Sequence, residues 1–230
     1  MSLNSFAQEL ADTTYNKLYR NSFALGLHFS TQGWGIYGEY TKQKNYKYHH
    51  VLAVQISSIH HKNEFKTTAN NGRRNFFYYK INSFVSLRPT IGGNYKVFES
   101  RRDNGIEVQF KWKVGPSIGL LKPVYLDIGN PSDNGFTREE RYDPDDHGYS
   151  VIQGKASWFR GLGESSIRIG IHQKLGFNFN FSKMNEGISG GEIGFLVDYF
   201  PTKQVEIMYG TDNYKVFTGF YLQFELGNKF

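Results

Sequence analysis

Residues 105–121 read GIEVQFKWKVGPSIGLL, and this stretch decides the fold. Its even positions from Ile106 to Leu120 are all apolar, whereas its odd positions from Glu107 to Gly119 are charged, amide, hydroxyl or glycine residues. Successive side chains of a β-strand point to opposite faces, so the alternation predicts one strand with an apolar face and a polar face. The strand is much longer than the usual five or six residues.

The same alternation returns along the whole chain. It is found at residues 22–30, 34–41, 50–58, 77–88, 166–181, 191–200 and 216–226. Together with the first stretch this makes about eight principal strands. No segment has a convincing helical period, and no repeat or linker divides the chain. We therefore expect a single all-β domain.

The composition agrees with this reading and excludes several classes of protein. No apolar run approaches the roughly 18 residues of a transmembrane helix, which excludes helical membrane proteins. The chain holds 16 Tyr, 20 Phe and 25 Gly but only 6 Pro, a composition that favours strands and tight turns. It has no Cys, which excludes thiol catalysis, thiolate metal sites and lipid attachment through a cysteine.

The formal net charge is +6, which raises the question of nucleic-acid binding. The Lys and Arg residues are scattered along the chain, however, and no helix or tail gathers them into a stripe. We expect no nucleic-acid partner.

Two kinds of barrel fit an alternating up-and-down chain. A soluble lipocalin-like barrel has its apolar face inside, whereas a transmembrane barrel has an apolar belt against lipid and a polar lumen. Here the glycines lie on the polar side, where a narrow lumen is crowded, and bulky aromatics lie on the other side. The strands are also long enough to span a bilayer. We therefore predict a closed antiparallel transmembrane β-barrel of about eight strands with up-and-down topology.

The end of the chain resembles the C-terminal strand of bacterial outer-membrane proteins. Residues 217–230 read FTGFYLQFELGNKF, and the alternating apolar positions end in an aromatic residue. The resemblance implies a signal read by the insertion machinery. The residues that match it are Phe220, Leu222, Phe224, Leu226 and Phe230, whereas Asn228 departs from the pattern.

The chain as a whole resembles the small outer-membrane β-barrel proteins of Bacteroidota. The stretches that carry this resemblance are Ser5 to Gln8, Ser86 to Pro89 with Ile91 to Gly93, and Gly115 to Tyr125. It implies an integral protein of the bacterial outer membrane in contact with membrane lipid, and it implies no activity.

The expected organisation has three parts. Residues 1–7 are the remnant of a signal peptide, because Ser5 and Ala7 fit the small positions before a cleavage site. Residues 8–20 form an N-terminal periplasmic segment. Residues 21–230 form the barrel, with long loops near 59–76 and 122–164.

Charged residues of the polar face are the first candidate site. Those expected in the lumen are Lys80, Arg88, Lys111, Lys113, Arg168, Lys174, Glu107, Glu192, Asp198 and Glu225, with Glu39 and His172 beside them. Isolated buried charges cost several kcal/mol, so we expect these groups to pair and fill the narrow lumen. A narrow conduit or a small anion site is the alternative.

Other candidate chemistry is weaker. The loop residues Tyr142 to His147 offer oxygen and imidazole ligands for Ca²⁺, but they lack the spacing of a calcium loop. The pairs His49-His50 and His60-His61 fit surface residues better than metal ligands. His28 and Ser30 share the lumen face of the first strand and could belong to a His/Ser/acid catalytic set of a hydrolase. No nucleophile-elbow motif supports this. We expect no enzyme activity, no cofactor and no metal.

Two functions from different classes remain. One is a structural or accessory subunit of a larger outer-membrane assembly, such as secretion or insertion machinery, whose partners are other outer-membrane proteins. The other is a stand-alone transporter or porin-like barrel with a basic lumen. A filled lumen and long loops rich in Tyr, Asn and Arg favour the first.

Overall fold

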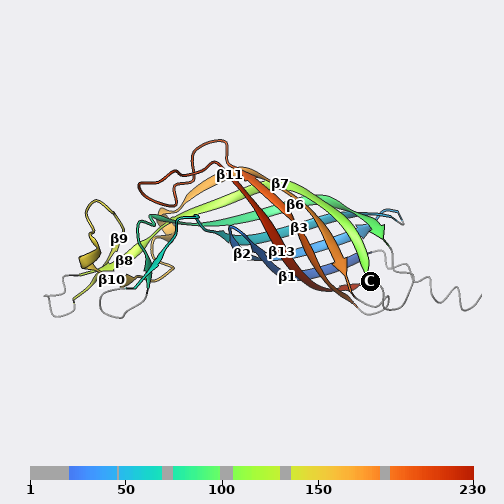
Figure 1. Cartoon of the computed structure of the whole chain (residues 1–230), viewed down its shortest axis with the longest axis horizontal. Helices are drawn as coiled ribbons and strands as arrows, with labels where there is room; N and C mark the ends of the chain where they lie inside the picture. The colour runs from blue at the N-terminus through green and yellow to red at the C-terminus, as the bar shows by residue number, and fades with distance from the viewer. Residues whose placement is uncertain (1–20, 46, 69–74, 99–105, 130–135, 182–186) are drawn as a thin grey trace, which may run out of the picture.

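The computed structural model describes residues 21–45, 47–68, 75–98, 106–129, 136–181 and 187–230. The expected signal remnant and periplasmic segment, residues 1–20, lie outside these ranges. The main element is a closed eight-stranded barrel (Figure 1). Its strands are β1 (Asn21–Ser30), β2 (Gly33–Gln43), β3 (Tyr48–Ile59), β6 (Asn82–Phe98), β7 (Glu107–Pro123), β11 (Ser166–Asn180), β12 (Ile188–Tyr199) and β13 (Val216–Lys229).

Each barrel strand pairs antiparallel with the barrel strands before and after it in the chain. The ring closes between β1 and β13, where Ser22 lies opposite Lys229 and Ser30 lies opposite Tyr221. Closure matters because a bilayer offers no hydrogen-bonding partner to an open strand edge. The predicted up-and-down topology is confirmed.

The remaining elements lie in the connections. They are β4 (Lys66–Thr67), β5 (Phe76–Phe77), β8 (Tyr125–Ile128), β9 (Arg138–Arg141) and β10 (Ile152–Lys155), with the short 3₁₀ helices η1 (Tyr149–Val151) and η2 (Leu162–Glu164). Strands β10, β8 and β9 form a small separate sheet. Among the described residues, no helix has the length and apolar character needed to cross a bilayer.

The two ends of the barrel differ (Figure 1). The described parts of the connections after β3, β7 and β12, residues 60–68, 75–81, 124–129, 136–165 and 200–215, all lie at the end that we call the loop end. The first residue of β1 and the last residue of β13 lie at the opposite end, which we call the terminal end.

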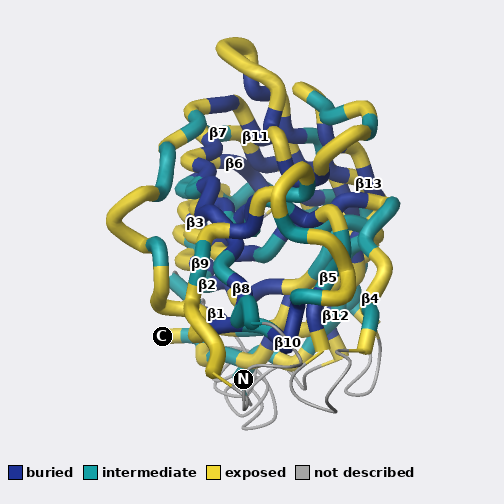
Figure 2. The backbone as a smooth tube through the Cα atoms, turned by 90° about the vertical axis from the view of Figure 1, so that its left-hand side faces the viewer, coloured by how far each residue is buried: buried dark blue, intermediate teal, exposed yellow. Residues whose placement is uncertain are grey.

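The barrel wall has apolar side chains on its outer surface and polar side chains inside, the reverse of a soluble protein. Buried and exposed residues alternate along the strands (Figure 2), and the exposed ones are apolar: Trp34, Ile91 and Phe220 are 59%, 63% and 69% exposed. The inward side chains Arg88 and Asp198 are 1% and 0% exposed. A lipocalin-like barrel would bury the apolar face instead, so this arrangement excludes it. The chain is a transmembrane β-barrel.

The bounds of one predicted strand differ by many residues from those observed, and the bounds of the others differ by a few. The sequence predicted a strand at residues 77–88, whereas β6 begins at Asn82 and continues to Phe98. The aromatic run before Asn82 belongs to the loops: Phe76 lies in β5 and is fully buried against loop residues. Lys80, predicted in the lumen, lies in the loop segment before β6. The prediction was wrong there because an aromatic run has the same appearance in a strand and in a small loop core.

The outward belt can be tested at Phe195. This residue lies near the middle of β12, opposite Leu175 and Phe220, and packs its ring 5.7 Å from that of Phe220. We expect Phe195→Arg to lower the free energy of unfolding in lipid vesicles by about 2–4 kcal/mol, because a charge then faces the hydrocarbon. Phe159→Arg, at a loop position 73% exposed, is the control and should cost little. Equal costs in a denaturant titration would contradict the lipid-facing assignment.

Candidate functional site

Three carboxylates meet in the centre of the lumen. Glu39 of β2, Glu192 of β12 and Glu225 of β13 have oxygen atoms within 4.8 Å of one another. The Lys111 ammonium, from β7, lies among them, 2.8 Å from Glu39, 3.3 Å from Glu225 and 3.5 Å from Glu192. All four side chains are buried, so each charge depends on the others for its neutralisation.

Two more lysines complete this central cluster. Lys113 Nζ lies 2.5 Å from Glu39 and 3.4 Å from Glu192. Lys174 Nζ lies 3.6 Å from Glu192 and donates a hydrogen bond to Gln223 Oε1. Three cations therefore face three carboxylates. The ring geometry brings them together, since Lys111 and Glu225 are 114 residues apart in the chain.

Neutral side chains satisfy the remaining carboxylate oxygens. Tyr37 donates to Glu225 Oε2 at 2.8 Å, and Asn178 donates to Glu225 Oε1 at 2.6 Å. Tyr221 donates to Glu192 Oε1 at 2.6 Å. The sequence pattern did not single out these three residues as site residues. The signal available was their inward parity, which places Tyr37 on the same strand face as Glu39 and Tyr221 on the same strand face as Glu225.

A second cluster lies nearer the loop end. Arg88 of β6 makes two hydrogen bonds to Asp198 of β12, Nε to Oδ1 at 3.0 Å and Nη2 to Oδ2 at 2.7 Å. Arg88 also donates to Ser57 Oγ at 2.5 Å, and His172 Nδ1 lies 3.0 Å from Asp198 Oδ1. Across both clusters four basic side chains, Arg88 and three lysines, face four carboxylates.

An apolar plug covers the lumen at the loop end. The connection between β12 and β13 folds back over the barrel mouth, and its apolar side chains pack against inward residues at the strand ends. The plug consists of Phe200, Val205, Ile207 and Met208 from the connection, with Ile59, Phe84, Leu121 and Phe217 from the strands. Backbone N–H groups of Ile81 and Asn82 donate to Ile207 O at 3.0 and 3.2 Å, which ties the plug to the start of β6.

Lys80 stabilises the plug from outside the barrel. Its Nζ lies 2.6 Å from Glu64 Oε2, and His60 Nδ1 lies 3.1 Å from the same oxygen. Burial alone would raise the pKa of Glu64, but the hydrogen bonds from His60 and Lys80 outweigh it and lower that pKa to about 2. Burial lowers the pKa of Lys80 even beside this carboxylate. The pair therefore joins the segment after β3 to the segment before β6.

The remaining predicted lumen charges lie near the barrel ends. Glu107 is at the terminal end, 3.4 Å from Lys96 Nζ, and both are partly exposed. Arg168 lies near the loop end of β11 and makes no ion pair with any residue of the described ranges. The structure thus places the central charges together and leaves Glu107, Arg168 and Lys80 apart from them.

Neither candidate metal site has a free set of ligands. Within the described part of the chain, the three central glutamates are the one cluster with metal-ligand spacing, and Lys111 lies between them. In the acidic loop, His147 Nδ1 accepts from Asp143 N at 3.1 Å, so Nε2 carries the proton that faces Glu140 Oε2 at 3.3 Å. Both imidazole nitrogens are therefore engaged. Asp145 accepts a hydrogen bond from Tyr209 at 2.7 Å.

The hydrolase candidates are not joined to each other. His28 is fully buried beside the Tyr221 ring, and neither of its ring nitrogens has a hydrogen-bond partner in the described structure. Ser30 Oγ donates instead to Gly33 O at 3.1 Å, in the turn after β1. Of the histidine pairs, His61 Nε2 lies 3.1 Å from Asp212 O and so helps to hold the loops together.

The loops form an ordered body beyond the plug, which we call the loop head. Strands β8, β9 and β10 with neighbouring segments enclose a small core of Phe76, Val124, Leu126, Tyr142 and Ile152. The bond from Tyr209 to Asp145 links this core to the plug connection.

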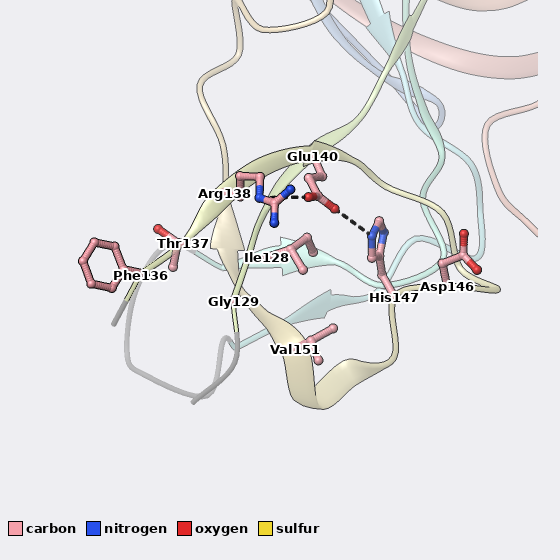
Figure 3. Close-up of a pocket in the computed structure, with 9 residues that line it drawn as sticks. All are labelled: Ile128, Gly129, Phe136, Thr137, Arg138, Glu140, Asp146, His147 and Val151. Atoms are coloured by element: carbon pink, nitrogen blue, oxygen red, sulfur yellow. Dashed lines mark hydrogen bonds and ion pairs between the residues drawn. The ribbon is translucent and has the colours of Figure 1, made fainter. Parts of the chain in front are cut away.

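A hollow of ≈ 560 Å³ opens on the loop head (Figure 3). Glu140 is one of its lining residues and lies between Arg138 Nε at 3.4 Å and His147 Nε2 at 3.3 Å (Figure 3). Phe136, 82% exposed, lies at its rim.

The chain matches no protein-family model and no curated protein. Among solved structures it is similar to crystal structures of Ail, the attachment invasion locus protein of Yersinia pestis, with a TM-score of 0.45, 12% identity and coverage of 91% of this chain and 97% of that one. It is also similar to Neisserial surface protein A, with a TM-score of 0.43, 9% identity and coverage of 91% and 95%. The fold assignment rests on the strand pairing and side-chain distribution of this chain.

Charge balance in the lumen can be tested at Glu192. Replacing it by Gln keeps the shape but leaves three lysines with two carboxylates, so we expect a loss of about 3–5 kcal/mol in the free energy of unfolding. Glu107→Gln removes a partly exposed pair and should cost at most about 1 kcal/mol.

The double variant Lys113→Gln/Glu192→Gln restores neutrality and should cost less than the sum of its single changes. Denaturant titration in lipid vesicles measures the wild type, the single variants Glu192→Gln, Lys113→Gln and Glu107→Gln, and the double variant. The balanced network would be contradicted if the double variant lost as much free energy of unfolding as the two single variants together. It would also be contradicted if Glu192→Gln lost no more free energy of unfolding than Glu107→Gln.

Proposed function

We propose that this chain is an integral protein of the bacterial outer membrane that works as a structural or accessory subunit of a larger outer-membrane assembly. Closed antiparallel barrels with an apolar outer belt are the type of spanning protein found in that membrane. The proposed partners are other outer-membrane proteins.

The observation that carries the proposal is the filled lumen. The inward charges Arg88, Lys111, Lys113 and Lys174 all have carboxylate or amide partners, and the apolar plug covers the mouth above them. A basic conduit needs unpaired cations facing a water-filled path. The balance of four cations against four carboxylates supports a scaffold more than a transporter.

The loop head supports a contact role. It has its own buried core, with Phe76, Leu126 and Ile152 fully buried. Large apolar side chains nevertheless remain on its surface, including Phe136 and Phe159 at 82% and 73% exposure. Exposed aromatics on an ordered surface are typical of protein contact sites.

The proposal can be tested by co-purification of the affinity-tagged protein from native outer membranes. We expect a stable set of outer-membrane proteins to accompany the wild type. Leu126→Asp should reduce their yield at least tenfold, because it breaks the loop-head core while leaving the barrel strands intact.

Thr202→Asp adds the same charge at an exposed loop position and serves as the control. Heat-modifiable gel migration checks that each barrel is folded. The accessory role would be contradicted if the wild type purified without other proteins, or if Leu126→Asp left the yield of co-purifying proteins unchanged.

A further inference from the structure

Three neighbouring barrel strands are longer than the rest. β6 and β7 have 17 residues each and β11 has 15, against 10 in β1. At about 3.4 Å per residue and a tilt of about 45°, 17 residues rise about 41 Å, whereas 10 rise about 24 Å and match an apolar band of about 25 Å. The long strands therefore extend beyond the band, toward the loop end (Figure 1).

The extension leaves one strand edge open. β11 pairs with β7 over its whole length, up to Ser166 opposite Leu121. Its pairing with β12 stops at Ile171 opposite Tyr199. The segment Ser166–Ile169 therefore has a neighbouring strand on one side only, and no backbone hydrogen bond from the described residues reaches its other side. Gly170 is buried beside Tyr199 and the Phe200 ring.

The outward side chains of this open edge are apolar. Ile167 and Ile169 are each 63% exposed. An unpaired backbone edge is unfavourable in lipid, and exposed isoleucines on such an edge are unfavourable in water. A strand that pairs with the edge satisfies both demands, because it supplies hydrogen bonds and apolar contacts together.

Arg168 lies between these isoleucines and has no acidic partner. Its Nε is buried without a hydrogen-bond partner, and its Nη1 bonds only to Ile167 O at 3.3 Å. The other inward cations of the barrel centre are all paired, as Lys113 and Lys174 show. Arg168 is thus a cation on an open edge that a carboxylate from outside the chain would complement.

We propose that Ser166–Ile169 is a strand-addition site for an extended segment of another protein, with apolar residues opposite Ile167 and Ile169 and a Glu or Asp opposite Arg168. This inference rests on the proposed function and names the surface by which the assembly is joined. Residues directly opposite each other on paired strands share a face, so the pairing sets the apolar–acidic–apolar pattern. Pairing with a second copy centred on Arg168 would oppose two arginines, which is unfavourable.

The test uses two labelled peptides and the full chain folded in nanodiscs. One peptide is Thr-Val-Glu-Val-Thr, and the other has Lys in place of Glu. Fluorescence polarisation should show at least tenfold tighter binding of the Glu peptide to the wild type. Arg168→Glu should reverse the preference, whereas Arg160→Glu, an exposed arginine of the loop head, should leave it unchanged.

Several results would overturn the inference. In the binding assay, these are equal binding of the two peptides, no binding of either peptide, or a preference that Arg168→Glu leaves unaltered. A wild-type protein that forms a dimer, with Arg168→Glu converting it to a monomer, would also overturn the inference.

A photoreactive residue at position 169 tests the same edge in native membranes. Crosslinks to a co-purifying protein, lost in Arg168→Glu, support the inference. A native complex that forms without such crosslinks overturns the inference and leaves the accessory role standing. Charge-selective peptide binding without any native complex overturns the accessory role and leaves the edge as a peptide site.

Discussion

A narrow barrel that encloses charges must neutralise them within its own wall. The lumen meets this constraint with four cations and four carboxylates, and Lys111 contacts all three central glutamates. The fourth cation and the fourth carboxylate, Arg88 and Asp198, neutralise each other through two hydrogen bonds. Because each member neutralises several others, removal of one leaves an uncompensated charge in a poorly hydrated interior. The network therefore fixes the relative positions of β2, β6, β7, β11, β12 and β13.

Because the lumen is filled, the outer surfaces are the part of the protein that other molecules can contact. The plug, the loop head and the open edge of β11 all lie at the loop end, and each has a different physical character. The plug is apolar and covered, the loop head is an ordered body with exposed aromatics, and the edge offers unpaired backbone groups. The proposed accessory role would use these surfaces at one side of the membrane.

Much of the barrel follows from local alternation. Period-two patterning predicts the strands and the lipid-facing side, because any spanning strand must separate an apolar face from a polar one. It also predicts inward parity for Lys111, Lys113 and Glu192. It does not predict which charges meet, since that depends on register and curvature around the ring. Glu39 and Lys111 are 72 residues apart and come together only when the barrel closes.

Other features have no local pattern. Val205, Ile207 and Met208 lie in a connection without periodicity, and their burial follows from the space left at the mouth. The aromatic run before Asn82 resembles a strand and instead contributes to a loop core. The open edge arises from a difference in length between β11 and β12, which requires the register of both pairings.

We infer that paired charges and an apolar plug close the lumen, and we propose that the protein works through its outer surfaces. Ion conductance of the folded wild type in planar bilayers tests it most directly, with heat-modifiable migration confirming the folded barrel. We expect no steady ohmic current, because the lumen is closed. Well-defined channels with anion preference would contradict it and identify the lumen lysines as selectivity charges.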